Sequence, residues 1–289
     1  MNGTVIALDI GGTKVAAGLV EPDGAIVARA SDATPAHASA KSMWAVVAGL
    51  IDSLDGRATA VAVGCGCGGP METDGRSVSP LNIPAWRRFP LRDRLATHTG
   101  LPAYVDNDAK ALALGEGRFG AARGVRDYIG MVVSTGIGGG IVLDGRLLDG
   151  DTGNAGHVGH VIVEPQGRMC PCGSQGCVEA EASGTAIAAI TGRPAAEADR
   201  DMQSRCGTLV GRAIATSVVL LDLRLAVVAG SVALGYRDAF FTAAQAEVDR
   251  CCRIEFSRGV RVVPGALGSD GPLVGAATVA FTNLERTTT

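Results

Sequence analysis

Residues 4–20 read TVIALDIGGTKVAAGLV, and this stretch decides the fold. An apolar run ends in Asp9, the small residues Gly11–Lys14 follow, and a second apolar run continues to Val20. Apolar runs of this length, joined through glycines, are typical of buried strands that meet at a tight turn. We therefore expect a strand–turn–strand unit that holds a carboxylate at the end of its first strand.

A related arrangement returns later in the chain. Residues 128–143 read YIGMVVSTGIGGGIVL, which predicts a strand over 128–133, a glycine turn over 134–140 and a strand over 141–143. Two copies of one strand–turn–strand plan predict two related α/β domains that face a cleft.

The segments around these units alternate between helical and strand patterns. Helices are expected over 39–55, 91–99, 109–116, 183–191, 206–221 and 273–284, and strands over 25–30, 58–63, 103–105 and 225–229. We place the domain boundary near residue 115. The small N-terminal lobe covers 1–115 and is joined by the C-terminal helix 273–289, and the large lobe covers 116–272.

The composition is that of a globular protein with mixed charges. Of its 289 residues, 47% are hydrophobic and 19% are charged, which excludes an intrinsically disordered chain. The net charge of −3, without a basic stripe, argues against nucleic acid as the main partner. No secretory leader and no apolar run of membrane-spanning length are found, so we expect a cytoplasmic protein that contacts no membrane. In that compartment, the eight cysteines are metal ligands or reduced thiols.

The first glycine turn has the composition of a phosphate-binding loop. Gly11 and Gly12 expose backbone N–H groups that can surround phosphate oxygens, and Thr13 and Lys14 add a hydroxyl and a cation. Asp9 can hold Mg²⁺ through water, as carboxylates near nucleotide phosphates do. An ordinary β-hairpin also has such a turn, so this motif alone does not decide between the two interpretations.

The second glycine turn, residues 134–140, strengthens the phosphate interpretation. It lacks the Lys-Ser/Thr ending of a Walker motif and does not fit the dinucleotide-binding pattern. Two such turns, one in each half of the chain, favour a nucleotide clamped between two lobes.

The sequence Val105-Asp106-Asn107-Asp108 places three polar side chains where a strand ends and a helix begins. Asp106 or Asn107 can cap that helix. For Asp108 we favour chemistry, because a hydroxyl that attacks a γ-phosphoryl needs a carboxylate to orient it and accept its proton.

Residues 160–177 contain one histidine and three cysteines: His160, Cys170, Cys172 and Cys177. Four nitrogen and sulfur ligands are the set that a closed tetrahedral zinc site takes. Gly173 and Gly176 allow the backbone to turn back so that the cysteines can meet. A disulfide is the alternative, and the expected cytoplasmic location disfavours it.

His157 lies three residues before His160 and can in principle bind the same ion. Since four ligands are complete without it, we expect His157 to face the cleft. Glu179 follows the last cysteine by two residues, so a zinc site would fix its position too. The other residues of note are expected to be structural: buried thiols at Cys65 and Cys67, core residues at Cys206, Cys251 and Cys252, core or sugar-loop packing at Trp86, and surface positions at His37 and His98.

Together these motifs resemble the ROK family of bacterial sugar kinases and repressors. The resemblance runs from about residue 5 to 280 and includes, in order, LDIGGTK, SPLNIPAW, VDNDAKALALGE, STGIGGGI, GHVGH and CPCGSQGCVEAEASG. It implies an α/β fold of the two-lobed actin/hexokinase-like (ribonuclease H-like) type, with an interlobe cleft and a structural zinc knot. It also implies ATP with Mg²⁺, and a homodimer or homotetramer.

The resemblance assigns roles to particular residues. Asp108 is implied to be the general base, and His160 to bind zinc through one ring nitrogen and a sugar hydroxyl through the other. The sugar-binding set is Gly69, Asn82, Asn107, Asp108, His157, His160 and Glu179. The nucleotide-binding set is Asp9, Gly11, Gly12, Thr13, Lys14, Thr135, Gly136, Gly230 and Ser231. The metal ligands are His160, Cys170, Cys172 and Cys177.

One position departs from the family pattern. Many family glucokinases have a sugar-binding glutamate where this chain has His157, and an imidazole cannot reproduce the two acceptors of a carboxylate. Some bacterial N-acetylmannosamine kinases resemble this chain in having histidine there. The expected reaction is transfer of the γ-phosphoryl of ATP to the 6-hydroxyl of a hexose or an N-acylhexosamine. Whether polyphosphate can replace ATP stays open.

Three other functions compete with a kinase. A ROK-type sugar-responsive transcriptional regulator and a non-catalytic sugar sensor share the sugar fold, but the intact Asp108 and the lack of a DNA-binding pattern ahead of residue 4 count against the regulator. A zinc hydrolase needs an open coordination position, and four protein ligands leave none.

Overall fold

The computed structural model describes residues 3–35 and 39–288, and it divides into two compact units. Unit 1 comprises residues 1–119, 149–155 and 269–289, and unit 2 comprises 120–148 and 156–268. The chain therefore leaves unit 2 after residue 148, contributes a short segment to unit 1, and re-enters unit 2 at Gly156. Nothing in the sequence pattern predicted that excursion.

Unit 1 is built on a five-stranded sheet in the order β3-β2-β1-β4-β5. Its first three strands are antiparallel, while β1, β4 and β5 run parallel to one another. The strands are β1 (Thr4–Ile10), β2 (Lys14–Val20), β3 (Ile26–Ala33), β4 (Ala60–Cys67) and β5 (Ala103–Asn107). Because parallel strands place their carboxyl ends at one edge, the loops after β1, β4 and β5 leave the sheet together.

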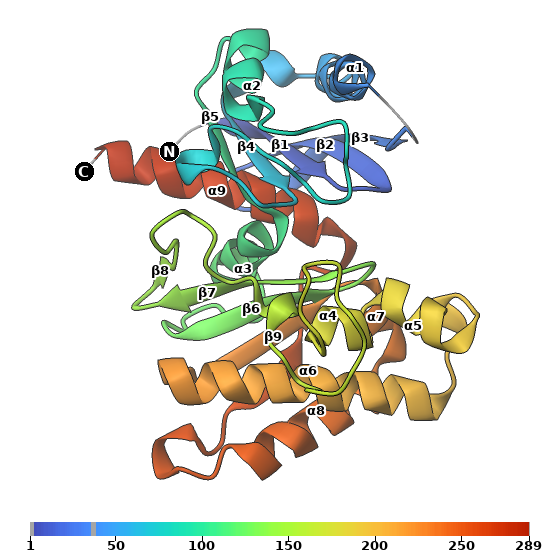
Figure 1. Ribbon diagram of the computed structural model, residues 1–289. Helices are drawn as coiled ribbons and strands as arrows, with labels where there is room; N and C mark the ends of the chain where they lie inside the picture. Colours follow the sequence, from blue (N-terminus) through green and yellow to red (C-terminus); the bar gives the residue numbers. More distant parts are fainter. Residues whose placement is uncertain (1–2, 36–38, 289) are drawn as a thin grey trace. The chain divides into compact units, whose positions relative to one another are not determined.

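Helices cover both faces of this sheet (Figure 1). They are α1 (Ala40–Asp52), α2 (Leu91–Thr99), α3 (Asp108–Phe119) and α9 (Gly271–Thr288). One core cluster contains apolar residues of α1 and α2, and the other contains α9 residues such as Leu273 and Phe281. Close packing of α9 depends on small residues, since a Cβ at Gly64 of β4 would lie 2.0 Å from the carbonyl oxygen of Ala276. The expected C-terminal helix thus completes the core of unit 1.

Unit 2 repeats the plan with the sheet order β10-β9-β6-β7-β8. Its strands are β6 (Tyr128–Val133), β7 (Ile137–Leu143), β8 (Arg146–Leu147), β9 (Leu225–Ala229) and β10 (Arg261–Pro264). Its helices are α4 (Val178–Ala182), α5 (Gly184–Thr191), α6 (Arg200–Leu221), α7 (Ser231–Tyr236) and α8 (Asp238–Cys251). As in unit 1, a hairpin pairs in antiparallel fashion, and parallel strands extend the sheet from its first strand.

Helix α6 is long and apolar enough to cross a membrane by length and composition alone. Ten of its residues are buried, however, and seven of these belong to the core cluster of unit 2. The helix packs against α8 at backbone distance, because a Cβ at Gly207 would lie 2.2 Å from the carbonyl oxygen of Phe240. Its apolar character is therefore explained by burial inside unit 2.

The structure differs from the sequence-based elements in two instructive places. Gly138–Gly140, expected in the turn, are part of β7, where a Cβ at Gly139 would lie 2.7 Å from Cγ2 of Val158. Gly139 thus serves close packing and not chain reversal. Helix α8 was not predicted, although its buried residues Phe240, Ala244 and Val248 recur every four positions, as the inner face of a helix does.

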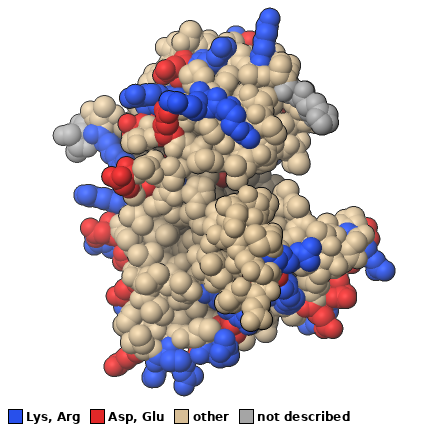
Figure 2. All heavy atoms as spheres, in the orientation of Figure 1, with Lys and Arg blue, Asp and Glu red and all other residues tan. Residues whose placement is uncertain are grey.

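On the face shown in Figure 2, acidic and basic side chains are interspersed. This distribution agrees with the small net charge of −3.

Candidate functional site

Three sheet positions in unit 1 form one row at the carboxyl edge of the parallel strands. Asp9 pairs with Gly66 in the register of β1 and β4, and Gly66 pairs with Asp106 in the register of β4 and β5. Gly66 brings a further carboxylate into this row, because a Cβ there would lie only 3.3 Å from the Cα of Asp108. The fold thus gathers Asp9 and Asp108 at one place, although 98 residues separate them in the sequence (108 − 9 − 1).

Asp108 opens helix α3, and the residues before it shape this junction. The side-chain oxygen of Asn107 accepts hydrogen bonds from the backbone N–H groups of Ala109 at 3.0 Å and Lys110 at 3.4 Å. An Asp108 carboxylate oxygen also accepts from Ala109 N, at 2.9 Å. Asn107 is therefore the residue that caps the helix, and the cap fixes the backbone from which Asp108 projects.

The pKa of Asp9 is raised to about 7. Burial is the main cause, the nearby Asp108 carboxylate adds to it, and Lys14 opposes both. A bound cation would be favoured beside Asp9, since it would offset both the burial of this carboxylate and its repulsion by Asp108. The surroundings of Asp9 are therefore compatible with Mg²⁺.

The first glycine turn lies next to Asn82. The turn is closed by a hydrogen bond from Gly11 N to the Lys14 carbonyl oxygen at 3.0 Å. A Cβ at Gly12 would lie 2.7 Å from the Cβ of Asn82, and one at Gly68 would lie 3.4 Å from its side-chain oxygen. The structure thus brings the expected phosphate turn, the glycine loop after β4 and a predicted sugar-binding asparagine together within unit 1.

Gly69 belongs to the same loop. Its carbonyl oxygen accepts a hydrogen bond from Leu81 N at 3.3 Å, and its peptide bond to Pro70 is cis. Thr13 and Lys14 of the neighbouring turn are exposed, so their hydroxyl and ammonium groups can reach a ligand.

In unit 2 the second glycine turn is Ser134–Gly136, shorter than expected. Its Ser134 N donates to the Gly136 carbonyl oxygen at 2.9 Å, and Thr135 is exposed at its tip. Helix α5 braces the turn, because Gly184 N donates to the Ser134 carbonyl oxygen at 2.7 Å. This bracing by the start of α5 was not visible in the sequence.

Glu179 lies directly beneath this turn. Its carboxylate accepts a hydrogen bond from Ile137 N at 2.9 Å, and a Cβ at Gly136 would lie 2.9 Å from the same oxygen. A side chain at position 136 would therefore displace the Glu179 carboxylate from its place beside the turn. Glu179, expected at the sugar, thus also organises the second glycine turn of its own unit.

Gly230 and Ser231 adjoin the same turn. Gly230 has φ +99°, and a Cβ there would lie 2.4 Å from the carbonyl oxygen of Val133, so only glycine fits. The hydroxyls of Ser231 and Ser134 are 2.9 Å apart. All four nucleotide residues predicted in the second half, Thr135, Gly136, Gly230 and Ser231, therefore gather at the ends of β6 and β9.

The four predicted zinc ligands form one cluster in unit 2. The ligand atoms of His160, Cys170, Cys172 and Cys177 all lie within 4.8 Å of one another. Cys170 Sγ is 3.7 Å from His160 Nδ1, and Cys172 Sγ is 3.7 Å from Cys177 Sγ. Sulfur atoms bound to one tetrahedral zinc ion are about 3.8 Å apart at the usual bond length. The donors therefore fit a zinc ion, and His160 directs Nδ1 toward it.

The thiols of the cluster differ in their electrostatics. A hydrogen bond from the Ser174 backbone, with the neighbouring thiols, lowers the pKa of Cys172 to about 7. Burial raises the pKa of Cys177 to about 12. The low pKa of Cys172 supplies a thiolate at neutral pH, which is the form that binds metal.

Glycines and a buried acid hold the knot in shape. Gly176 has φ +78°, and a Cβ there would lie 1.7 Å from the carbonyl oxygen of Glu164. Glu181 is 2% exposed, and it accepts from Arg168 N at 2.5 Å and pairs with Arg205 at 2.6 Å. Glu181 was not predicted as part of this site: residues two apart on a helix do not share a face, so Glu179 gave no indication of it.

His157 lies outside the metal cluster. Its side chain is exposed, and its ring centroid is 6.1 Å from that of His160. The expectation that four ligands are complete without His157 agrees with the cluster that the donor atoms form.

The residues expected to be structural are mostly buried. Trp86 is 0% exposed and stacks on Phe89 with 4.3 Å between ring centroids, and Cys65, Cys67, Cys206 and Cys252 are buried thiols. Cys251 is only half-buried. His98 is exposed, as expected, and its Nε2 lies 3.2 Å from Oδ1 of Asp52. His37 lies outside the described residues.

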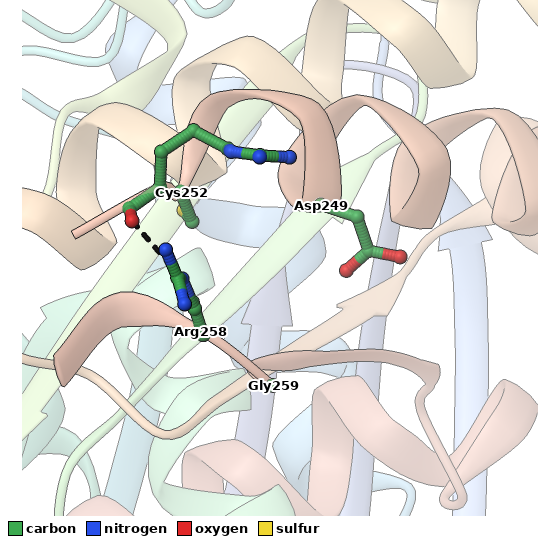
Figure 3. A pocket seen from close by; sticks show the side chains of 5 residues that line it. Asp249, Cys252, Arg258 and Gly259 are labelled. Carbon is green, nitrogen blue, oxygen red and sulfur yellow. Dashed lines mark hydrogen bonds between the residues drawn. The ribbon is translucent and has the colours of Figure 1, made fainter. Parts of the chain in front are cut away.

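A pocket of about 370 Å³ near the end of α8 is lined by Asp249, Cys252, Arg253, Arg258 and Gly259 (Figure 3). None of the predicted site residues lines it.

Comparison with known sequences places this geometry in context. The model of the ROK family matches residues 5–283. An N-acetylmannosamine kinase from Escherichia fergusonii is 37% identical over 246 residues, covering 80% of this chain and 84% of that protein. A glucokinase from Thermotoga maritima is 41% identical over 185 residues, covering 63% of this chain and 58% of that protein. The match therefore spans less than two thirds of that glucokinase.

Solved structures give the same fold over nearly the whole chain. A ROK family glucokinase from Streptomyces griseus, in complex with glucose and AMPPNP, has a TM-score of 0.83 at 33% identity. The match covers 97% of this chain and 100% of that protein. A ROK hexokinase from Thermus thermophilus has a TM-score of 0.81 at 31% identity, covering 98% of this chain and 99% of the other. A ROK family transcriptional regulator reaches 0.80 at 24% identity, covering 96% of this chain and 77% of the other. Since the fold serves enzymes and regulators alike, function depends on the site residues.

Proposed function

This chain belongs to the ROK family and is a sugar kinase, and we propose that it transfers the γ-phosphoryl of ATP to the 6-hydroxyl of a hexose or an N-acylhexosamine. The observation that carries the proposal is the junction of Asp9, Gly66 and Asp108 at one edge of the sheet in unit 1. A regulator needs no such pair of carboxylates, whereas phosphoryl transfer needs a base for the hydroxyl and a cation for the phosphates.

Asp108 is the proposed general base. Its carboxylate accepts the proton of the sugar hydroxyl as that oxygen attacks the γ-phosphorus. The capped start of α3 supports this role, because it fixes the backbone of Asp108 through Asn107 and Ala109. Catalysis of this kind consists largely of positioning and charge stabilisation.

The two glycine turns are the proposed phosphate-binding elements. In unit 1, Gly12 and Thr13 would offer backbone N–H groups and a hydroxyl, while Gly11 closes the turn through its N–H and leaves room for a phosphate; Thr135 and Gly136 would offer N–H groups and a hydroxyl in unit 2. Gly230 and Ser231 are proposed to contact the nucleoside. Asp9 would hold Mg²⁺ through water, and the ion, when bound, neutralises charge on the transferring phosphate.

The sugar is proposed to contact Gly69, Asn82, Asn107, Asp108, His157, His160 and Glu179. The exposed ring of His157 stands where many family glucokinases have a carboxylate, and this supports an N-acylhexosamine at least as well as glucose. An imidazole can donate to an acyl carbonyl oxygen, whereas a carboxylate can only accept. The similarity to N-acetylmannosamine kinases over 80% of the chain points the same way.

Zinc is proposed to be structural. His160, Cys170, Cys172 and Cys177 would hold it, and four protein ligands leave no position for water activation. His160 uses Nδ1 toward the metal, so its Nε2 stays available for a sugar hydroxyl. The ion would thereby orient His160 and the start of α4, which carries Glu179.

A cytoplasmic location and a homodimer or homotetramer are also proposed. The eight free cysteines support a reducing compartment. The oligomeric state rests on the family resemblance alone.

A coupled assay of ADP release tests the function. Purified protein with ATP and Mg²⁺ is given glucose, mannose, N-acetylglucosamine or N-acetylmannosamine, each at several concentrations. Turnover of at least one sugar, with a sugar-6-phosphate as product, is expected. A preference for the N-acetylated sugars would support the proposal that His157 selects an N-acylhexosamine. A clear preference for glucose would contradict that proposal. No turnover with any of the four sugars, with ATP bound, would favour a regulator or a sensor.

A further inference from the structure

Lys110 is a buried cation whose partners belong to two different segments. It is 2% exposed, and its Nζ lies 3.0 Å from Asp106 and 2.8 Å from Asp149. The same Nζ donates to the Gly153 carbonyl oxygen at 3.1 Å. Burial alone would lower the pKa of Lys110, but the two carboxylates outweigh it and raise that pKa. Lys110 is therefore a charged residue at neutral pH that needs these acceptors.

The acceptors Asp149 and Gly153 lie in residues 149–155, the short segment that unit 2 contributes to unit 1. Asn154 fastens the same segment at a second point. Its side-chain oxygen accepts from Met71 N at 3.1 Å, and its side-chain nitrogen donates to the Met71 carbonyl oxygen at 2.9 Å. The segment is thus held by the buried Lys110 ammonium at Asp149 and Gly153, and by a paired amide contact at Asn154.

The position of these contacts in the chain links two parts of the proposed site. Lys110 follows Asp108 by two residues in the first turn of α3, and Asp106 precedes Asp108 by two. Asn154 precedes His157 by only three residues. At no more than about 3.5 Å per residue, the path from Asn154 to His157 spans roughly 10 Å or less. Fastening the segment therefore limits where the His157 backbone can go.

We propose that Lys110, Asp149 and Asn154 are positioning residues that fix His157 for sugar binding by fastening residues 149–155 beside the start of α3. This inference rests on the proposed kinase function. The three residues act through His157, and they touch neither sugar nor nucleotide. They hold the segment next to the start of α3, which carries Asp108, and thereby limit the position of His157, the residue proposed to select the sugar.

Generic stabilisation of unit 1 accounts poorly for this arrangement. A buried ion pair is often no more stabilising than an apolar pair of the same volume, because both charges lose their hydration. What the pair provides is a defined geometry, with Nζ directed at two atoms of one short segment. Asp149 is 55% exposed at its side chain, so it contributes little as a stabilising charge. Its role in fixing the position of the segment explains why the contact is made.

The test uses the variants Asp149→Ala and Asn154→Ala in the full-length protein. Lys110 keeps Asp106 in both, so no buried charge is left without a partner. Asp144→Ala is the matched control: it removes an exposed aspartate paired with Arg126 on the turn between β7 and β8, five residues before Asp149. The KM for the best sugar, the KM for ATP and kcat are measured for each protein. Hydrogen–deuterium exchange is measured over residues 149–157.

We expect the sugar KM to rise about tenfold in Asp149→Ala and in Asn154→Ala, because misplacement of about 1 Å in a binding group has effects of this order or larger. The KM for ATP and kcat should change by less than about threefold, since the cap on α3 keeps Asp108 in place. Exchange over 149–157 should become at least about tenfold faster in both variants, reporting local opening of the segment. Asp144→Ala should resemble the wild type in every measurement.

Other outcomes separate the two proposals. A wild type with no kinase activity removes the proposed function, whereas the exchange data still report whether the segment is fastened. Active variants with a normal sugar KM, despite faster exchange, overturn the positioning role. Equal rises in the sugar KM and the ATP KM also overturn it, because they indicate general loosening. Lys110→Arg should retain a nearly normal sugar KM, and Lys110→Met should not. If both lose it equally, charge at this position does not act as proposed.

Discussion

Replacing Asp108 with asparagine should separate sugar binding from phosphoryl transfer. The asparagine oxygen can still accept the hydrogen bond that Ala109 N now donates at 2.9 Å, so the start of α3 should keep its shape. Asparagine cannot take a proton, however, so the variant loses the base. The predicted result is a fold and a sugar affinity close to those of the wild type, with transfer nearly abolished.

The magnitude follows from the role. A positioned general base accelerates a reaction by about 10²–10⁴-fold, which corresponds to about 3–5 kcal/mol of transition-state stabilisation. Removing the Asp108 charge also relieves a cause of the raised pKa of Asp9, so nucleotide affinity should not fall for electrostatic reasons. We therefore expect kcat to fall at least about 100-fold while the sugar Kd changes by less than about threefold.

Two measurements check this prediction. ADP release gives kcat, and calorimetric titration with the sugar gives Kd, with the thermal midpoint as a control for folding. Asp144→Asn, a change at an exposed aspartate far along the chain, is the matched control and should leave both constants unchanged. A kcat for Asp108→Asn within tenfold of the wild type would refute the assignment of the base.

Three further predictions concern the metal, a glycine and pH. Cys177→Ser should lower bound zinc, measured by atomic absorption, well below one ion per chain and raise the sugar KM, and an unchanged zinc content would contradict the proposed ligand set. Gly12→Ala places a Cβ 2.7 Å from that of Asn82, so the sugar KM should rise at least about tenfold, and an unchanged value would show that Asn82 takes no part in sugar binding. Hydrogen bonding by Arg250, with Arg212, lowers the pKa of Glu247 to about 2, so its contribution to stability is complete above about pH 4.5 and is lost as the pH falls toward 2. At pH 6, the free energy of unfolding of the wild type should therefore exceed that of Glu247→Gln by about 2 kcal/mol. Denaturant titrations should show this difference shrinking below pH 4.5. A difference that does not change with pH would contradict the assigned cause.

The sequence predicted the parts of the fold that local patterns encode. The two strand–turn–strand units, the α/β class and a cluster of one histidine and three cysteines follow from apolar runs, glycine turns and residue spacing, and the structure contains them. The ROK family assignment is confirmed by the family match over residues 5–283. These features are local, so a single segment carries enough information to specify each.

Long-range features could not be predicted in the same way. Gly139 of β7 serves an approach to Val158 that only the folded chain reveals. The contact of Glu179 with the turn at Gly136 joins residues 43 positions apart. Lys110 is bound by Asp106, four residues earlier, and by Asp149 and Gly153, which lie far along the chain. Only the contact with Asp106 could be expected from neighbouring residues in the sequence.

Transfer of a labelled phosphoryl group tests the central claim most directly. Purified protein is mixed in excess with ATP labelled at the γ-phosphorus, in the presence of Mg²⁺ and either N-acetylmannosamine or glucose, and the products are separated after one turnover. A kinase in which Asp108 activates the sugar hydroxyl should place nearly all of the label on the sugar as its 6-phosphate. Label recovered only as inorganic phosphate, or left entirely on ATP, would contradict that account.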